Sequence, residues 1–361
     1  MSARDRLVVG WERGFGSGAG GLLTAVAISY RGLLGARDWL YARGMLASRG
    51  LDCLVVSVGN LTVGGTGKTP AVELAVRTLL ELGHRPGVLS RGYGRHSAGV
   101  QVVADAASIR LDAEEAGDEP FLLARRLSGV PVVVGANRYE AGRLARERFG
   151  VTALVLDDGF QHRTLRKDLE IVMARAASPW GNGRLLPGGP LREPLASLAR
   201  ADLVVATGAR RAEDAAQVRA TVERVAPGVP VLTALHAPTE CFESSAMRFV
   251  PLGTLGAAKL LAFAGIGEPA AFQRTLGEAA TVVADFVSFA DHHWYTRDDL
   301  ARLDRRASDL GADGLVTTEK DWVRLRRLPP LERPLYVLSV RLRLTSGEAE
   351  WRAAFERLAR R

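Results

Sequence analysis

Cysteine is nearly missing from this sequence, with only Cys53 and Cys241 among 361 residues. The two lie far apart, and no C-x-x-C pair or cluster of cysteine with histidine occurs. Because disulfide scaffolds and structural zinc sites are built from such clusters, the sequence argues against both. It is typical of a reducing compartment.

Signatures of nucleic-acid binding are absent too. We find no zinc finger, no aromatic RNA-binding signature and no recognition-helix pattern, although the formal net charge is +8. A basic protein can meet nucleic acid, an anionic membrane surface or phosphorylated substrates, and we expect no nucleic-acid partner here. Repeats and low-complexity tracts are also missing, and a hydrophobic content of 47% suffices for a large core.

No apolar run is long enough to cross a bilayer, which takes about 20 residues. The longest run in the N-terminal segment stops at Arg31, and no A-x-A cleavage pattern is present. Residues 1–50 carry seven arginines against three acidic residues, which is half of the net charge. Arg37 interrupts a broad helical face of eight apolar side chains: Leu22, Leu23, Val26, Tyr30, Leu33, Leu34, Leu40 and Tyr41. Such a helix either packs on the core or lies in a membrane interface, with Trp39 near the headgroups.

Beyond residue 50, short apolar runs alternate with helical patterns. Strands are predicted at 53–60, 87–94, 130–138, 151–162, 168–174 and 201–208, and helices at 69–83, 118–129 and 138–150. The pattern loosens near residue 235, and a second alternating region follows with strands at 259–269, 285–296, 313–325 and 334–344. We expect an α/β fold with a mostly parallel sheet covered by helices on both faces, and ligands at the carboxyl ends of its strands.

Three ranges follow from this texture. Residues 1–50 form a basic, apolar N-terminal segment, residues 51–235 the α/β core, and residues 236–361 a smaller α/β subdomain. These boundaries are inferred from the order of the predicted strands and helices along the chain.

The stretch GNLTVGGTGKTP (59–70) joins a predicted buried strand to a predicted helix and ends like a phosphate-binding loop. Glycines let backbone N–H groups curl around phosphate oxygens, and the helix N-terminus adds its positive end. Lys68 is expected at the outer phosphates and the Thr69 hydroxyl at Mg²⁺. Thr62 stands where the usual pattern has its first glycine. The predicted nucleotide-binding residues are Thr62, Val63, Gly64, Gly65, Thr66, Gly67, Lys68 and Thr69.

An acidic strand end supplies the other half of a nucleotide site. The stretch ALVLDDGFQH places Asp157 and Asp158 directly after an apolar run, with Gln161 and His162 just beyond. Carboxylates at a rigid strand end opposite a phosphate loop are typical of Mg²⁺ chemistry, so Asp157, Asp158 and Gln161 join Thr69 as predicted metal residues. The guanine-reading N-K-x-D pattern is missing, which favours ATP over GTP.

Three further stretches carry alternatives. In GDEP, Asp118 precedes a predicted helix, where capping is the commoner role and catalysis the rarer one. In FADHHWYT, His292 follows an expected strand end, which is either a surface turn or a site that orients a base or binds a metal. The ordered loop 179–195 carries Arg184, Arg192 and Glu193, and its arginines suit phosphate.

Seven stretches in order, SVGNLTVGGTGKTP, SRGYGR, GDEP, DDGFQHRTLRKDLEIV, GNGRLLPGGPLREPL, FADHHWYT and TTEKD, resemble the tetraacyldisaccharide 4'-kinase family of Gram-negative lipid A synthesis. The resemblance spans roughly residues 10 to 345 and includes the variant phosphate loop. Two positions depart from it, Ala174-Arg175 and Glu268.

The resemblance implies transfer of the γ-phosphate of ATP, with Mg²⁺, to the 4'-hydroxyl of a tetraacylated glucosamine disaccharide 1-phosphate, forming lipid IVA. It assigns the family's base to Asp118, with His292 orienting it, and the site-lining loop to Arg192 and Glu193. It also implies a P-loop NTPase-like core and a peripheral, monomeric protein on the cytoplasmic face of the bacterial inner membrane. The N-terminal helix then docks on that membrane. The alternative is a P-loop ATPase switch that phosphorylates no sugar.

Overall fold

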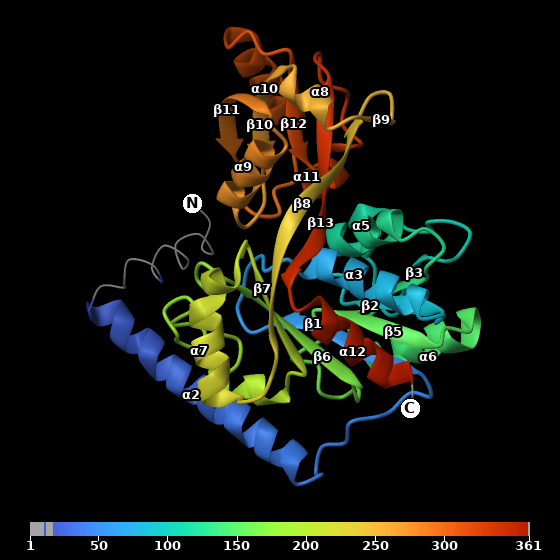
Figure 1. The fold of residues 1–361 in the computed structure, drawn as a ribbon, viewed down its shortest axis with the longest axis vertical. Coiled ribbons are helices and arrows are strands. Elements are labelled where there is room, and N and C mark those ends of the chain that lie inside the picture. The colour runs from blue at the N-terminus through green and yellow to red at the C-terminus, as the bar shows by residue number, and fades with distance from the viewer. Residues whose placement is uncertain (1–10, 12–16, 360–361) are drawn as a thin grey trace. The chain divides into compact units, whose positions relative to one another are not determined.

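A computed structural model describes residue 11 and residues 17–359; the parts of the predicted N-terminal segment at 1–10 and 12–16 lie outside it. The described chain forms two compact units (Figure 1). The first contains the residues up to 91, residues 137–235 and the chain from 344 onward, and the second contains 92–136 and 236–343. The predicted ranges differ from this division. They assign residues 92–136 to the core and the chain from 344 onward to the subdomain. The order of elements along the chain does not show where it leaves one unit and re-enters the other.

The first unit is built on a parallel sheet in the strand order β8-β7-β6-β1-β5-β2. Its strands are β1 (Leu54–Asn60), β2 (Pro86–Ser90), β5 (Ala153–Asp157), β6 (Leu169–Arg175), β7 (Leu203–Thr207) and the first part of β8 (Val231–Glu243). These strands are almost wholly buried, which explains why they are near-continuous apolar runs rather than alternating ones.

Helices cover this sheet on both faces (Figure 1). The unit contains α2 (Ser17–Ala42), α3 (Lys68–Glu81), α6 (Arg138–Phe149), α7 (Ala216–Val225) and α12 (Glu348–Ala359), with short 3₁₀ helices η1 (Leu195–Arg200) and η2 (Ala212–Ala215). Helix α7 packs with η1 over β6 and β7 in one apolar cluster. On the other face α3 contacts β1 and β5, and Trp351 of α12 donates a 3.0 Å hydrogen bond to Thr78 of α3.

The second unit has its own parallel strands in the order β11-β10-β12-β13. Its strands are β10 (Lys259–Ala264), β11 (Val282–Ser288), β12 (Gly314–Thr318), β13 (Leu335–Ser346), β9 (Arg248–Val250), which is antiparallel to the end of β8, and the antiparallel pair β3 (Gln101–Ala104) and β4 (Val132–Val134). Its helices are α4 (Ala113–Ala116), α5 (Asp118–Arg126), α8 (Gly253–Gly256), α9 (Pro269–Glu278), α10 (Arg297–Asp309) and α11 (Glu319–Leu325).

Three predicted elements of this unit are wrong in detail. The stretch after residue 235, predicted as loosened, continues as β8 to Glu243. The strand predicted over 285–296 ends at Ser288, so His292 lies in a loop before α10. The strand predicted over 313–325 turns into α11 after Thr318, whose side chain accepts from the Asp321 N–H and so caps the helix. The apolar residues Trp322, Val323 and Leu325 are buried from this helix rather than from a strand.

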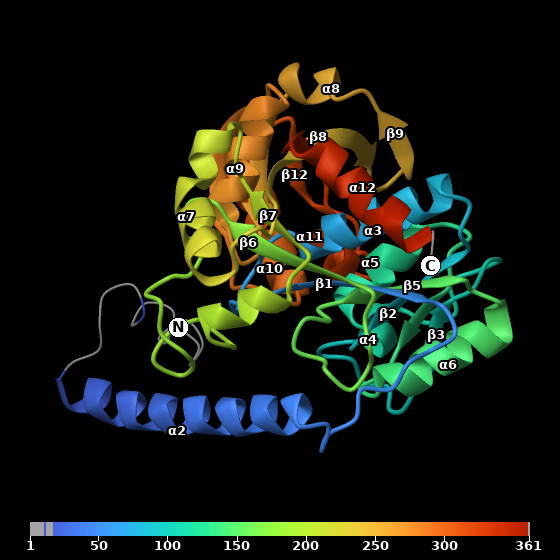
Figure 2. The same cartoon turned by 60° about the horizontal axis from the view of Figure 1, so that its bottom comes forward.

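Helix α2, seen along its length in Figure 2, buries only part of the predicted apolar stripe. Leu34 is buried, whereas Val26 and Leu33, predicted on the same face, are 47% and 71% exposed. Polar contacts add to the inward face, because the Tyr30 hydroxyl donates to the Arg192 carbonyl at 2.9 Å and Arg37 pairs with Glu193. Within the described part of the chain, every helix falls short of the length and apolar content that a membrane span requires.

Candidate functional site

The predicted phosphate loop leads from the end of β1 into the first turn of α3, as the sequence indicates. Gly64 and Gly67 have φ angles of 108° and 81°, which L side chains rarely adopt, so glycine is needed at both positions. Helix α3 begins at Lys68, and the buried Thr69 lies in its first turn. The loop therefore combines free backbone turns with a helix N-terminus, the arrangement that binds phosphate.

Thr62 needs no glycine because the chain is extended there. The segment 61–63 pairs with the loop at 190–192: Val63 N–H donates to the Pro190 carbonyl at 2.9 Å, and Arg192 N–H donates to the Leu61 carbonyl at 2.7 Å. An isolated bridge joins Thr62 to Leu191. The irregular first half of the phosphate loop is thus held by the loop that carries Arg192.

Lys68 is held beside two oxygen acceptors. Its Nζ donates to Asn60 Oδ1 at 3.2 Å and lies 3.5 Å from Asp158 Oδ1. Asn60 is fixed in turn, because its Nδ2 donates to the Thr62 carbonyl at 2.7 Å. Asn60 is not predicted from the sequence, although it lies in the quoted stretch; its role depends on the curl of the loop.

Asp158 joins the loop to its neighbours. Arg192 Nη1 donates to both of its carboxylate oxygens, at 2.9 and 2.7 Å, and lies 3.5 Å from Gln161 Oε1. Burial raises the pKa of Asp158, but the charges of Lys68 and Arg192 lower it by more, so this carboxyl is ionised below its ordinary range. Lys68 and Arg192 therefore supply positive charge beside this carboxylate.

The residues predicted for Mg²⁺ fit a magnesium ion. Asp157 ends β5, the strand next to β1, and Asp158 follows it, so their carboxylates and the Thr69 hydroxyl come from adjacent elements of one unit. Asp157 is 2% exposed, and its Oδ2 accepts from Ser90 Oγ at 3.0 Å. In the described chain Thr66 Oγ1 is buried without a hydrogen-bond partner, which suits a loop that receives phosphate oxygens. Magnesium is held by few carboxylates plus phosphates and waters, so this donor set is sufficient.

A second group of site residues lies within the second unit. Asp118 begins α5, and His292 lies in the loop between β11 and α10. His292 Nδ1 and Asp118 Oδ2 are 2.9 Å apart; since the carboxylate only accepts, Nδ1–H is the donor. Asp118 Oδ1 accepts from the Glu119 N–H at 2.9 Å, so Asp118 also stabilises its helix N-terminus. The N-cap position of α5 is Gly117, with no side-chain cap, so Asp118 is the first residue of the helix and its other carboxylate oxygen meets His292.

The backbone has positive φ angles at His292 and at Gly117, the residue before Asp118. Gly117 has φ 94°, and a Cβ there would lie 3.1 Å from the Tyr93 carbonyl oxygen, so only glycine fits before Asp118. His292 itself has φ 60°. His293 turns elsewhere, with its Nε2 3.0 Å from Asp299 Oδ2. The two adjacent histidines therefore have separate acidic partners.

Arg324 is the residue of this group that sequence reasoning missed. Its Nε and Nη2 donate to Asp118 Oδ2 at 2.8 and 2.5 Å, and its side chain is 1% exposed. Arg324 lies in α11, which the sequence did not predict as a helix, three residues beyond Asp321 of the quoted TTEKD stretch. Helical periodicity continued from that stretch would have placed it on the face of Asp321.

Burial raises the pKa of Asp118, yet the hydrogen bond from His292 and the charge of Arg324 lower it well below its ordinary value. Lys320 adds to this, and it also pairs with Glu119. Asp118 is therefore an ionised, hydrogen-bonded carboxylate.

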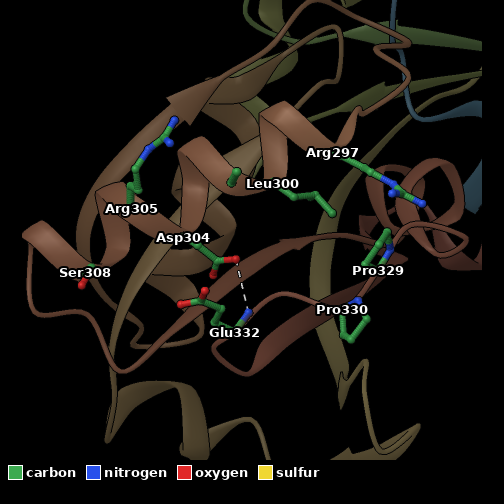
Figure 3. A pocket seen from close by; sticks show the side chains of 9 residues that line it. Arg297, Leu300, Asp304, Arg305, Ser308, Pro329, Pro330 and Glu332 are labelled. Atoms are coloured by element: carbon green, nitrogen blue, oxygen red, sulfur yellow. Dashed lines mark hydrogen bonds between the residues drawn. The ribbon is translucent and has the colours of Figure 1, made fainter.

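A pocket of about 470 Å³ in the second unit lies elsewhere (Figure 3). It is formed by α10 and the segment 329–332, with Arg297, Asp304 and Glu332 among its lining residues. The Glu332 N–H donates to Asp304 Oδ2 at 3.2 Å across it. None of the predicted site residues lines it, so this cavity is separate from the Asp118–His292 pair.

Comparison with known proteins shows what this chain resembles. The sequence profile of a family described as tetraacyldisaccharide-1-P 4'-kinase matches residues 20–360. A tetraacyldisaccharide 4'-kinase of Syntrophus aciditrophicus is 42% identical over 332 residues, covering 90% of this chain and 89% of the relative. One of Anaeromyxobacter dehalogenans is 43% identical over 311 residues, covering 86% and 82%.

A solved structure agrees with the sequence comparison. The LpxK of Aquifex aeolicus, crystallised in complex with ATP, is 31% identical and superposes with a TM-score of 0.74. The match covers 94% of this chain and 99% of that one. The predicted α/β fold, a mostly parallel sheet with helices, is confirmed by this likeness.

Proposed function

Because this chain belongs to the tetraacyldisaccharide-1-P 4'-kinase family, we propose that the residues of the phosphate loop, the acidic strand end and the Asp118–His292 pair carry out its reaction. That reaction transfers the γ-phosphoryl group of ATP to the 4'-hydroxyl of a tetraacylated glucosamine disaccharide 1-phosphate and gives lipid IVA. The proposal concerns which side chains act, and it uses residues of both units.

The first unit supplies the nucleotide residues in this proposal. The loop from Thr62 to Thr69 binds the phosphates through its N–H groups, and Lys68 neutralises the charge that develops on the transferred group. Thr69 with Asp157 or Asp158, and with Gln161 nearby, would hold Mg²⁺, which would supply further positive charge at the transferred group. Lys68 contacts Asn60 and Asp158 in this structure. When Lys68 binds phosphate it gives up these contacts, and Asp158 keeps its ion pair with Arg192.

The second unit supplies the proton acceptor. A sugar hydroxyl is far too weak an acid to ionise at neutral pH, so it needs a positioned base as it attacks, worth about a hundred- to ten-thousand-fold in rate. We assign that base to Asp118 together with His292, which orients the carboxylate through the 2.9 Å hydrogen bond. Groups coupled this closely accept a proton as a pair rather than singly. This hydrogen bond is the observation that carries the proposal.

An ATPase switch would need no such pair, and one assay separates the two functions. The protein is incubated with γ-labelled ATP, Mg²⁺ and the disaccharide 1-phosphate in detergent micelles, with Lys68→Met as the inactive control. We expect labelled lipid from the wild type and none from Lys68→Met. Release of labelled phosphate without labelled lipid would establish the switch instead.

We further propose that the protein acts as a peripheral protein on the cytoplasmic face of the inner membrane. The support is α2, whose outward face exposes Ile28 at 66%, Leu33 at 71% and Trp39 at 52%. Arg31 and Arg43 are exposed beside them, and Arg43 stacks over the Trp39 ring. Apolar side chains flanked by arginines are typical of helices that lie in the headgroup region of anionic membranes.

The double substitution Ile28→Glu with Leu33→Glu tests this docking. Burying such a side chain is worth about 1.5–3 kcal/mol, so we expect flotation with phosphatidylglycerol vesicles to fall at least about tenfold. The matched control is Met247→Glu, which changes a residue 51% exposed in the second unit. Equal flotation of both variants would rule out α2 as the docking element.

A further inference from the structure

Arg324 is unusual because a full positive charge is buried beside the two residues assigned to proton transfer. Its Nε and Nη2 both point at Asp118 Oδ2, at 2.8 and 2.5 Å. Nη2 also lies 3.3 Å from His292 Nδ1. One carboxylate oxygen therefore receives donors from Arg324 and His292 together.

The guanidinium is fixed from its other side as well. Arg324 Nη1 donates to the Gly265 carbonyl at 2.8 Å and lies 3.5 Å from Asp321 Oδ1. Asp321 is fully buried, and its Oδ1 also accepts from the Gly265 N–H and the Tyr295 hydroxyl, both at 2.9 Å. Thr318 Oγ1 donates to Asp321 Oδ2 at 2.6 Å. A side chain with this many partners has one position only.

The fixed position of Arg324 determines which ring nitrogen of His292 donates to Asp118. A carboxylate oxygen that already accepts two N–H groups of Arg324 is ionised and cannot donate, so the imidazole presents Nδ1–H to it and keeps Nε2 for other partners. His292 Nε2 has Asp291 3.9 Å away. The titratable and charged groups that face Asp118 are Arg324, His292 and Lys320, with Glu119 next in the chain.

We propose that Arg324 is a positioning residue of the phosphoryl transfer, which holds Asp118 Oδ2 where His292 Nδ1 meets it and fixes the tautomer of that histidine. The inference rests on the proposed function of the Asp118–His292 pair. Arg324 acts through Asp118 and touches no reacting atom. It is fitted to this role because a guanidinium gives two parallel donors, whereas an ammonium gives a point charge.

The experiment compares Arg324→Met, which removes the charge, with Arg324→Lys, which keeps it and loses the two-donor geometry. We expect Arg324→Met to lower kcat by about tenfold to a hundredfold, and Arg324→Lys to recover only a small part of it, because the charge is kept and the two-donor geometry is lost. Loss of the base itself sets the upper bound, at about ten-thousandfold. The dissociation constant of ATP should stay at the wild-type value in both. Arg327→Met is the matched control, because Arg327 pairs with Asp112 and Glu114 instead.

The pH profile of kcat/KM separates positioning from mere folding. Arg324 lowers the pKa of Asp118, so its removal raises that pKa, and the acidic limb of the Arg324→Met profile should move to higher pH. An unmoved limb, or Arg324→Lys as active as the wild type, would overturn the proposal. So would failure of both variants to bind ATP, since the role would then be structural. A wild type that labels no lipid would instead overturn the proposed function.

Discussion

Two candidate site residues have a backbone conformation that costs free energy. Among described non-glycine residues, Asp158 and His292 are two of four with positive φ, at 54° and 60°. Such conformations cost about 1–3 kcal/mol and persist where surrounding contacts determine them. Here Arg192 and Lys68 hold Asp158, and Asp118 holds His292. At both residues, side-chain pairing at a site outweighs local strain.

The adjacent histidines allow a matched comparison at this scale. His292→Gln removes the partner of Asp118, and we expect kcat to fall by about a hundredfold or more. His293→Gln changes a residue paired with Asp299 and should leave kcat within a few-fold of the wild type, although it lowers thermal stability. Steady-state assays with saturating ATP measure both. Equal losses would contradict the separate roles.

Asp118 also links stability to pH. Its pKa is lowered in the folded chain, so its charged contacts stabilise fully above the ordinary carboxyl pKa near 4 and are lost as pH falls below that value. Asp118→Asn should cost about 3 kcal/mol of unfolding free energy near pH 7, because it leaves Arg324 buried with a weaker partner. Urea unfolding at several pH values checks this. A difference from wild type that failed to shrink below about pH 4 would contradict it.

At the scale of elements, α2 and the phosphate loop are tied to the same stretch of chain. The loop at 190–193 pairs with 61–63. The same loop accepts hydrogen bonds from the Tyr30 hydroxyl and the Arg37 guanidinium of α2. Glu193 is 1% exposed and is shared by Arg37 and Arg200. The helix proposed to meet the membrane is therefore connected, within one unit, to the residues around Asp158.

Arg37→Met tests this connection. It leaves the buried Glu193 with Arg200 alone, and we expect a loss of about 1–3 kcal/mol in unfolding free energy, moderated because Arg37 is partly exposed. Adding Glu193→Gln should recover part of the loss, since the uncompensated charge is then removed. Arg31→Met, on the exposed face of the same helix, is the control. An equal effect of Arg31→Met would mean that the pair contributes nothing specific.

Elements with strong local signals could be predicted from the sequence. The strand 53–60 and the helix from residue 69 correspond to β1 and α3, because a buried apolar run, glycines and a helical pattern follow one another there. The exposure of Val26 and Leu33 on α2 could not be predicted. Tyr30 and Arg37 pair with a loop far along the chain, whereas apolar periodicity alone places all these apolar side chains on one buried face.

For the whole molecule, the predictability of the site follows from topology. Asp157 and Lys68 flank parallel neighbours β5 and β1, so strand order alone brings the acidic strand end to the phosphate loop. Asp118 and His292 are 174 residues apart, and only the family resemblance indicated them as partners. The chain crosses between its two units after residues 91, 136, 235 and 343, and only the crossing after 235 is marked in the sequence, where the alternating pattern loosens.

The most direct test of Asp118 as the base is the effect of Asp118→Ala on turnover and on ATP binding, measured on the same preparation. We predict that kcat falls by about a hundred- to ten-thousandfold, because the hydroxyl loses its proton acceptor. The dissociation constant of ATP should be unchanged, because the nucleotide residues belong to the other unit. Unchanged turnover, or a loss of ATP binding large enough to explain the loss of activity, would contradict the assignment of Asp118 as the base.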